Sequence, residues 1–126
     1  RLQIVNYPHG GGELRDHVDP RRNQRVVSGL IMSKKGIDFN EGGFYFRDKN
    51  NKKLNIEDKL EIGDSVIFYG SIVHGVEAVD KLKKLNWKTY KGRWFIGMFV
   101  NDSNHVKNRI TAKDLTKSTN YRRKAS

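Results

Sequence analysis

Two histidines and an aspartate are the residues of this chain best suited to hold a metal ion. His17 and Asp19 stand two positions apart at the end of a stretch that is typical of a strand, and His74 lies inside a later one. On an extended chain, residues i and i+2 point to the same side, so a divalent cation could bridge His17 and Asp19. We therefore expect a metal site if the fold brings His74 to the same place.

Two imidazoles and one carboxylate on one face of a metal form the facial triad of non-haem Fe(II) sites. Three coordination positions stay open, enough for a bidentate cosubstrate and O2, and such a centre can oxidise a C–H bond. Zinc also occupies catalytic sites with three protein ligands, so the ligand types leave both metals open. The alternative is that these are ordinary side chains, because a His-x-Asp pair also occurs by chance.

Arg93 helps to separate the two metals. It opens the last apolar run and by alternation shares a face with Phe95, Gly97 and Phe99. An arginine on an apolar face needs an anion, since a buried unpaired charge is costly. The guanidinium can grip a carboxylate through two parallel hydrogen bonds, as an anionic cosubstrate would require. The alternative is a solvated arginine at the mouth of the strand.

The elements that must position these residues are short apolar runs, each ended by Gly, Asn, Asp or Pro. Eight runs are predicted to be strands, at residues 2–6, 14–17, 25–32, 43–47, 52–56, 64–69, 72–77 and 93–100. Eight short strands with few helices predict a mainly all-β domain, either a sandwich or a double-sheet jelly roll. In a jelly roll the second and seventh strands can be neighbours, which would bring the three metal ligands together.

Two segments are predicted to be helical. Apolar residues at a spacing of three suit one short helix within residues 78–92, and residues 111–117 suit a terminal helical turn. The chain then divides into a β core over residues 1–110 and a basic tail over 111–126. The first residues already read as a strand, so we expect a further segment upstream of them.

Charge and composition exclude several classes of site. The formal net charge is +11 and the pI about 10.0, which favours an anionic substrate, a nucleic acid or another anionic partner. The chain has no cysteine, so disulfides, thiol nucleophiles and iron–sulfur clusters are excluded. No apolar run approaches the roughly 20 residues that span a bilayer. We expect a cytoplasmic protein with no membrane partner.

These residues resemble the Fe(II)- and 2-oxoglutarate-dependent dioxygenases, especially the prolyl-4-hydroxylase-like branch. The similar stretches come in the order of that family and span about residues 4–100. They are Tyr7-Pro8, Gly12, Leu14-Arg15-Asp16-His17-Val18-Asp19, Glu41-Gly42-Gly43-Phe44, Gly63-Asp64-Ser65-Val66-Ile67-Phe68, Val73-His74-Gly75-Val76 and Gly92-Arg93-Trp94.

The resemblance implies a double-stranded β-helix, the cupin-like form of the jelly roll, with Fe(II) on His17, Asp19 and His74. It also implies that 2-oxoglutarate chelates the iron, while its far carboxylate pairs with Arg93 and accepts a hydrogen bond from Tyr7. O2 would then convert 2-oxoglutarate to succinate and CO2, and a small-molecule or peptide substrate would be hydroxylated. Ascorbate is an optional reductant in such a reaction.

A non-catalytic β-barrel module that binds an anionic polymer, such as nucleic acid, is the alternative. The lysine-rich segment, which we define as residues 78–92, would supply a basic patch, with Trp87 and Tyr90 as stacking groups. The lysines of this patch are Lys81, Lys83, Lys84, Lys88 and Lys91. The two hypotheses also merge, because Lys83, Lys84 and Trp87 could belong to a lid that recruits an anionic substrate to the metal. The run His9-Gly10-Gly11-Gly12 is interpreted as a tight turn, because no Gly-x-Ser-x-Gly elbow accompanies it.

Overall fold

Antiparallel β-strands make up almost all of the regular structure. The computed structural model describes residues 1–20, 24–99 and 113–114. All eight predicted strands are present, and their bounds differ from the predicted ones by no more than two residues at either end. The elements are β1 (Leu2–Pro8), β2 (Gly12–Val18), β3 (Val26–Ile31), β4 (Gly43–Arg47), β5 (Lys53–Asn55), the 3-10 turn η1 (Glu57–Lys59), β6 (Ser65–Tyr69), β7 (His74–Val79), β8 (Gly92–Met98) and β9 (Lys113–Asp114).

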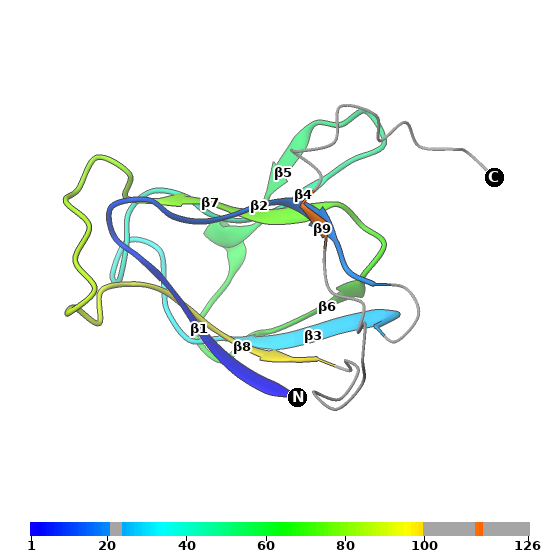
Figure 1. Cartoon of the computed structure of the whole chain (residues 1–126), viewed down its shortest axis with the longest axis horizontal. Coiled ribbons are helices and arrows are strands. Elements are labelled where there is room, and N and C mark those ends of the chain that lie inside the picture. Colours follow the sequence, from blue (N-terminus) through cyan, green and yellow to red (C-terminus); the bar gives the residue numbers. More distant parts are fainter. Residues whose placement is uncertain (21–23, 100–112, 115–126) are drawn as a thin grey trace.

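The strands form two sheets that face each other (Figure 1). The four-stranded sheet has the order β1-β8-β3-β6, and the five-stranded sheet has the order β5-β4-β7-β2-β9. Within the four-stranded sheet β1 pairs with β8 and β3 with β6. Within the five-stranded sheet β2 pairs with β7 and β4 with β5. The mainly-β fold class predicted from the strand pattern is therefore confirmed.

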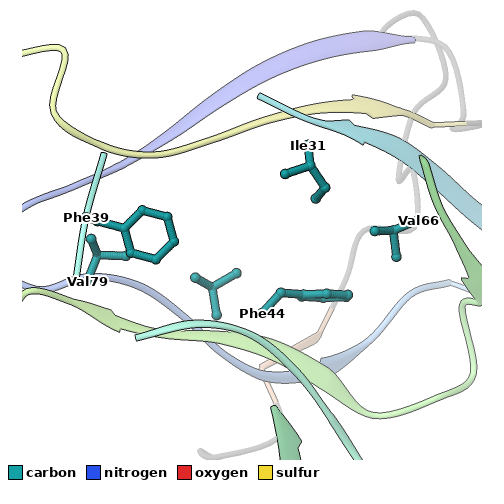
Figure 2. Close-up of a cluster of buried hydrophobic side chains, with 6 residues drawn as sticks. Ile31, Phe39, Phe44, Val66 and Val79 are labelled. Atoms are coloured by element: carbon teal, nitrogen blue, oxygen red, sulfur yellow. The ribbon is translucent and has the colours of Figure 1, made fainter. Parts of the chain in front are cut away.

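The hydrophobic core lies between the two sheets, and both contribute to it (Figure 2). Alternation sends every second residue of a strand inward, and the fully buried core side chains come from β3, β4, β6 and β7, with one more from the segment between β3 and β4. Burying an aliphatic or aromatic side chain of this size contributes about 1.5–3 kcal/mol. The fully buried cluster is Ile31, Phe39, Phe44, Val66, Val76 and Val79.

The outer face of the four-stranded sheet is also apolar. Leu2 and Ile4 on β1, and Ile67 and Tyr69 on β6, are each at least 67 % exposed. Strands of this sheet consequently carry apolar residues on both faces. Hydrophobicity alone therefore does not distinguish the inward face from the outward face in these strands.

The predicted helix over residues 78–92 is wrong. Val79 ends β7, Gly92 begins β8, and the residues between them form turns and irregular chain. Leu82 and Leu85, whose spacing suggested a helix, are 86 % and 45 % exposed and so mark no buried helical face. No helix in the described part of the chain is both long and apolar enough to cross a bilayer.

Asp80 directly follows β7 and connects the segment after it to the turn before β2. Its backbone has a positive φ of 43°, and its carbonyl accepts from the N–H of Gly10, while its carboxylate contacts His9 and Lys83. Burial alone would raise the pKa of Asp80, but hydrogen bonds from Lys83, two backbone N–H groups and His9 outweigh it and lower the pKa to about 2. Gly10 and Gly11 have φ of 87° and 105°, which confirms the predicted tight turn.

The predicted basic tail falls almost wholly outside the described residues, as does the helical turn predicted over 111–117. Only Lys113–Asp114 is described, and it pairs antiparallel with β2 as the short strand β9. At these two residues the chain is therefore a strand at the edge of the five-stranded sheet and not a helix.

Candidate metal centre

The fold brings His17, Asp19 and His74 together at one end of the five-stranded sheet. Strands β2 and β7 are antiparallel neighbours, and their register places His17 directly opposite His74. Asp19 follows β2, where its backbone N–H donates to the carbonyl of Gly70 at 2.8 Å and fixes the end of the strand against the β6–β7 turn. One potential ligand atom from each of the three side chains lies within 4.8 Å of the others.

The hydrogen bonds of the two imidazoles determine which nitrogen is left for a metal. Nδ1 of His17 lies 2.9 Å from the carbonyl oxygen of Arg15, and Nδ1 of His74 lies 2.9 Å from that of Ile72. A carbonyl only accepts, so each Nδ1 carries the proton and donates it. In the neutral ring Nε2 then keeps its lone pair, and a backbone carbonyl on the other nitrogen is the usual partner of a metal-binding histidine.

The Asp19 carboxylate lacks a partner among the described residues. Its Oδ2 is buried without a hydrogen bond and lies 3.5 Å from Nε2 of His74. Burial raises the pKa of Asp19, an effect that the nearby His17 opposes. Burial and His17 together lower the pKa of His74 to about 4, so its ring is neutral at pH 7. A lone pair and a carboxylate oxygen thus face each other, an arrangement that a cation between them would stabilise.

Aromatic side chains surround the inner side of this group. The ring of Phe68 lies 4.6 Å from that of His74 between centroids, and the rings of Phe44 and Phe46 lie 5.9 and 6.5 Å away. The triad residues are themselves buried, with His17 and His74 only 6 % and 4 % exposed. Apolar walls lower the local dielectric and strengthen the interaction of the three ligands with a cation. The chemistry of the donor set and its surroundings therefore fit a divalent metal ion.

Arg93 enters the same interior from the four-stranded sheet. It begins β8, faces Tyr7 of β1 in the register, and is 2 % exposed. The ring of Phe44 lies 5.7 Å from its Cζ, so Phe44 is a neighbour of both Arg93 and His74. The half-buried Tyr7 places its ring 5.8 Å from the same Cζ. Burial raises the pKa of the Tyr7 hydroxyl, partly offset by Arg93, so Tyr7 is a neutral hydrogen-bond donor at pH 7.

The anion beside Arg93 is a residue that the sequence analysis missed. Nε of Arg93 donates to Oε2 of Glu57 at 2.8 Å, and both side chains are at most 2 % exposed. The prediction that a buried Arg93 needs an anionic partner holds, but the protein supplies that partner itself. The sequence indicates only that a buried Arg93 needs some acid as its partner. That requirement does not distinguish Glu57 from the 13 other Asp and Glu residues.

Lys83, Lys84 and Trp87 are not brought to the group formed by His17, Asp19 and His74. β7 starts at His74 and continues for five more residues to Val79, which is about 17 Å at the usual rise of a strand. The lysine-rich segment begins at the far end of β7, at the opposite end of the sheets from the β6–β7 turn (Figure 1). The structure therefore gives no support to a lid over the triad formed by these side chains.

A second concavity lies on the outer face of the five-stranded sheet, with a volume of about 460 Å³. Its charged groups pair with one another, as in the contact of Arg47 with Asp16 at 2.6 Å and of Lys53 with Glu77 at 2.7 Å. Burial, followed by a hydrogen bond to Asp16, raises the pKa of the Tyr45 hydroxyl, which stays neutral. These paired charges stabilise the surface, and they do not point to a particular ligand.

Comparison of the chain with models of protein families, with curated proteins and with solved structures finds no match in any of the three.

Proposed function

We propose that this protein is an Fe(II)- and 2-oxoglutarate-dependent dioxygenase that hydroxylates a small-molecule or peptide substrate. One observation carries the proposal. The lone pair on Nε2 of the neutral His74 lies 3.5 Å from Oδ2 of Asp19, which accepts no hydrogen bond from any described residue, and His17 lies beside them. Placing two electron-rich atoms together without a proton or a cation is costly in a buried site, and a metal ion removes that cost.

The strand pairing supports a double-stranded β-helix. If a long antiparallel ribbon is folded over on itself, its strands pair first with eighth, second with seventh, third with sixth and fourth with fifth. The chain has all four of these pairs, and they alternate between the two sheets. This is the arrangement expected of a jelly roll built from eight strands, and β9 extends it at one edge.

Five residues of the candidate site have a defined part in the proposed reaction. His17, Asp19 and His74 would hold Fe(II). The bound iron would activate O2, and 2-oxoglutarate would be oxidised in the same reaction. Arg93 and Tyr7 would orient the far carboxylate of 2-oxoglutarate through a charge-assisted and a neutral hydrogen bond. Zinc fits the three ligands equally well. The order of the similar sequence stretches favours the iron enzyme, whereas Arg93 does not separate the two metals, because Glu57 already balances its charge.

Binding of iron and 2-oxoglutarate tests this function directly. Anaerobic addition of Fe(II) and 2-oxoglutarate to the protein is expected to produce a visible charge-transfer band, and admission of O2 with a suitable substrate to release succinate. The same titration with Zn(II) is the control and should give no colour. If no band forms and no succinate appears across a panel of small molecules and peptides, the dioxygenase assignment is wrong.

Binding of an anionic polymer by the lysine-rich segment is a second candidate function. It is favoured by the exposed aromatic side chains and lysines of this segment. Trp87 and Tyr90 are 76 % and 87 % exposed on the same loop as five lysines, the combination that binds single-stranded nucleic acids through stacking and phosphate contacts. The segment lies away from the metal ligands, so this binding would be independent of them.

Single substitutions in the lysine-rich segment test polymer binding. Trp87→Ala is expected to weaken binding of a single-stranded oligonucleotide by tenfold or more, in line with about 1–3 kcal/mol for one stacked base. Lys84→Glu should weaken it in a salt-dependent way, whereas Lys52→Glu on the β4–β5 turn is the matched control. Fluorescence anisotropy at several salt concentrations measures both. Equal effects of the two lysine variants would mean that the segment is not a specific surface.

A further inference from the structure

The buried pair of Glu57 and Arg93 raises a question about the cosubstrate site. Arg93 is the cation that would receive the far carboxylate of 2-oxoglutarate, yet Glu57 already neutralises it. The two side chains are 2 % and 1 % exposed, so water does not screen them from each other or from a bound anion. A second carboxylate must therefore share the guanidinium with the first.

Glu57 is held in this position by the fold and not by Arg93 alone. Its Oε2 also accepts from the backbone N–H of Phe44 at 2.6 Å, and its own N–H donates to Oδ1 of Asn55 at 2.9 Å. Gly43, with a φ of 116°, leaves room for the side chain, because a Cβ there would come within 2.5 Å of Cγ of Glu57. Glu57 is thus a fixed anion, and it does not swing aside freely when another anion arrives.

The contact uses only one edge of the guanidinium. Among the described residues, the recorded hydrogen bond of Arg93 is the one from Nε, and a guanidinium has four further N–H groups on its two Nη atoms. These groups can bind a second carboxylate, but the Arg93 charge would then be divided between two anions that repel each other. The affinity for the second anion is consequently lower than an unshared arginine would give.

We propose that Glu57 is a resident counter-ion of Arg93 that sets the affinity of the site for the far carboxylate of its 2-oxo acid. This inference rests on the proposed dioxygenase function. It makes Glu57 a specificity-determining residue, because its charge acts only on ligands with a second carboxylate. The charge of Glu57 lowers the ratio of the affinity for 2-oxoglutarate to the affinity for 2-oxo acids without a second carboxylate, such as 2-oxobutyrate.

Glu57→Gln tests the inference, because the amide oxygen can still accept from Phe44 and Arg93 while the charge is lost. Binding is measured anaerobically with Fe(II) from the charge-transfer band, and with Mn(II) from thermal stabilisation. We expect 2-oxoglutarate to bind roughly tenfold more tightly to the variant, in keeping with the cost of like charges in a buried site. The affinity for 2-oxobutyrate should not change, and Glu57→Asp, which keeps the charge, should retain the preference of the original protein.

The outcomes separate the two proposals. If the unaltered protein binds neither 2-oxo acid in the presence of metal, the dioxygenase function itself fails. If it binds 2-oxoglutarate and Glu57→Gln leaves the ratio of the two affinities unchanged or lowers it, only the role of Glu57 is overturned. If Glu57→Gln does not fold by itself, we expect Mn(II) with 2-oxoglutarate to restore the folded state. Mn(II) with 2-oxobutyrate is not expected to restore it. Equal rescue by both acids, or rescue by neither, would contradict the inference.

Discussion

Replacing His74 by alanine is expected to lower the affinity for Fe(II) by more than a hundredfold and to abolish the charge-transfer band with 2-oxoglutarate. Loss of an outer partner of a metal ligand alone costs about 10–100-fold in affinity, and this change removes the ligand itself. It also removes the lone pair that faces Oδ2 of Asp19 at 3.5 Å. Anaerobic titration with Fe(II), with and without 2-oxoglutarate, measures both effects.

A histidine at the other end of the sheets provides the matched control. His9 lies in the turn between β1 and β2 and contacts the Asp80 carboxylate, and His9→Gln keeps a hydrogen-bond donor there. We expect this variant to bind Fe(II) as the original protein does. Circular dichroism tests whether the His74 variant is folded. A folded His74→Ala protein with undiminished Fe(II) affinity would show that the three side chains are not the metal site.

The second large effect is on stability. Replacing Arg93 by methionine is expected to destabilise the protein by about 3–5 kcal/mol, because it leaves the Glu57 carboxylate buried and unpaired. The melting temperature should fall by on the order of 10–20 °C for a domain of this size. Chemical denaturation at pH 7 measures the free energy of unfolding, and thermal scans measure the shift. Methionine fills a similar apolar volume among Tyr7, Phe44 and Phe95, so lost packing contributes little.

A double variant distinguishes an unpaired charge from a loss of packing. Glu57→Gln combined with Arg93→Met removes both charges and keeps an oxygen that accepts from the N–H of Phe44. We expect it to recover most of the lost stability, so that the two substitutions are strongly non-additive. If the double variant is as unstable as Arg93→Met alone, the buried ion pair is not the origin of the destabilisation.

The strand pattern and the grouping of His17 with Asp19 are the parts of the structure that local reasoning predicts well. Short apolar runs between Gly, Asn, Asp and Pro residues determine where the backbone can extend, and all eight predicted strands are present. The period of two along a strand also places His17 and Asp19 on one side, and the structure brings both to His74. The metal and the activity remain predictions, which the experiments above address.

Local reasoning fails where long-range contacts decide the outcome. The apolar spacing of Leu82 and Leu85 predicts a helix, but the backbone is held instead by contacts of Asp80 with the turn that precedes β2. The apolar residues on both faces of β1 and β6 likewise hide which face is inward. Neither feature can be read from a window of neighbouring residues, because the competing partners are distant in the chain.

The strands, the basic charge and the residue types of the triad could be predicted, since each follows from local backbone preference or from residue chemistry. Three features depend on long-range packing: β2 lies beside β7, the lysine-rich segment is remote from the triad, and Glu57 is the anion beside Arg93. Glu57 and Arg93 are 36 residues apart and on different elements. A buried guanidinium needs an anionic partner, and any acid near it can serve. Which acid lies near Arg93 depends on how the two sheets pack, so the pairing cannot be predicted before the tertiary structure is known.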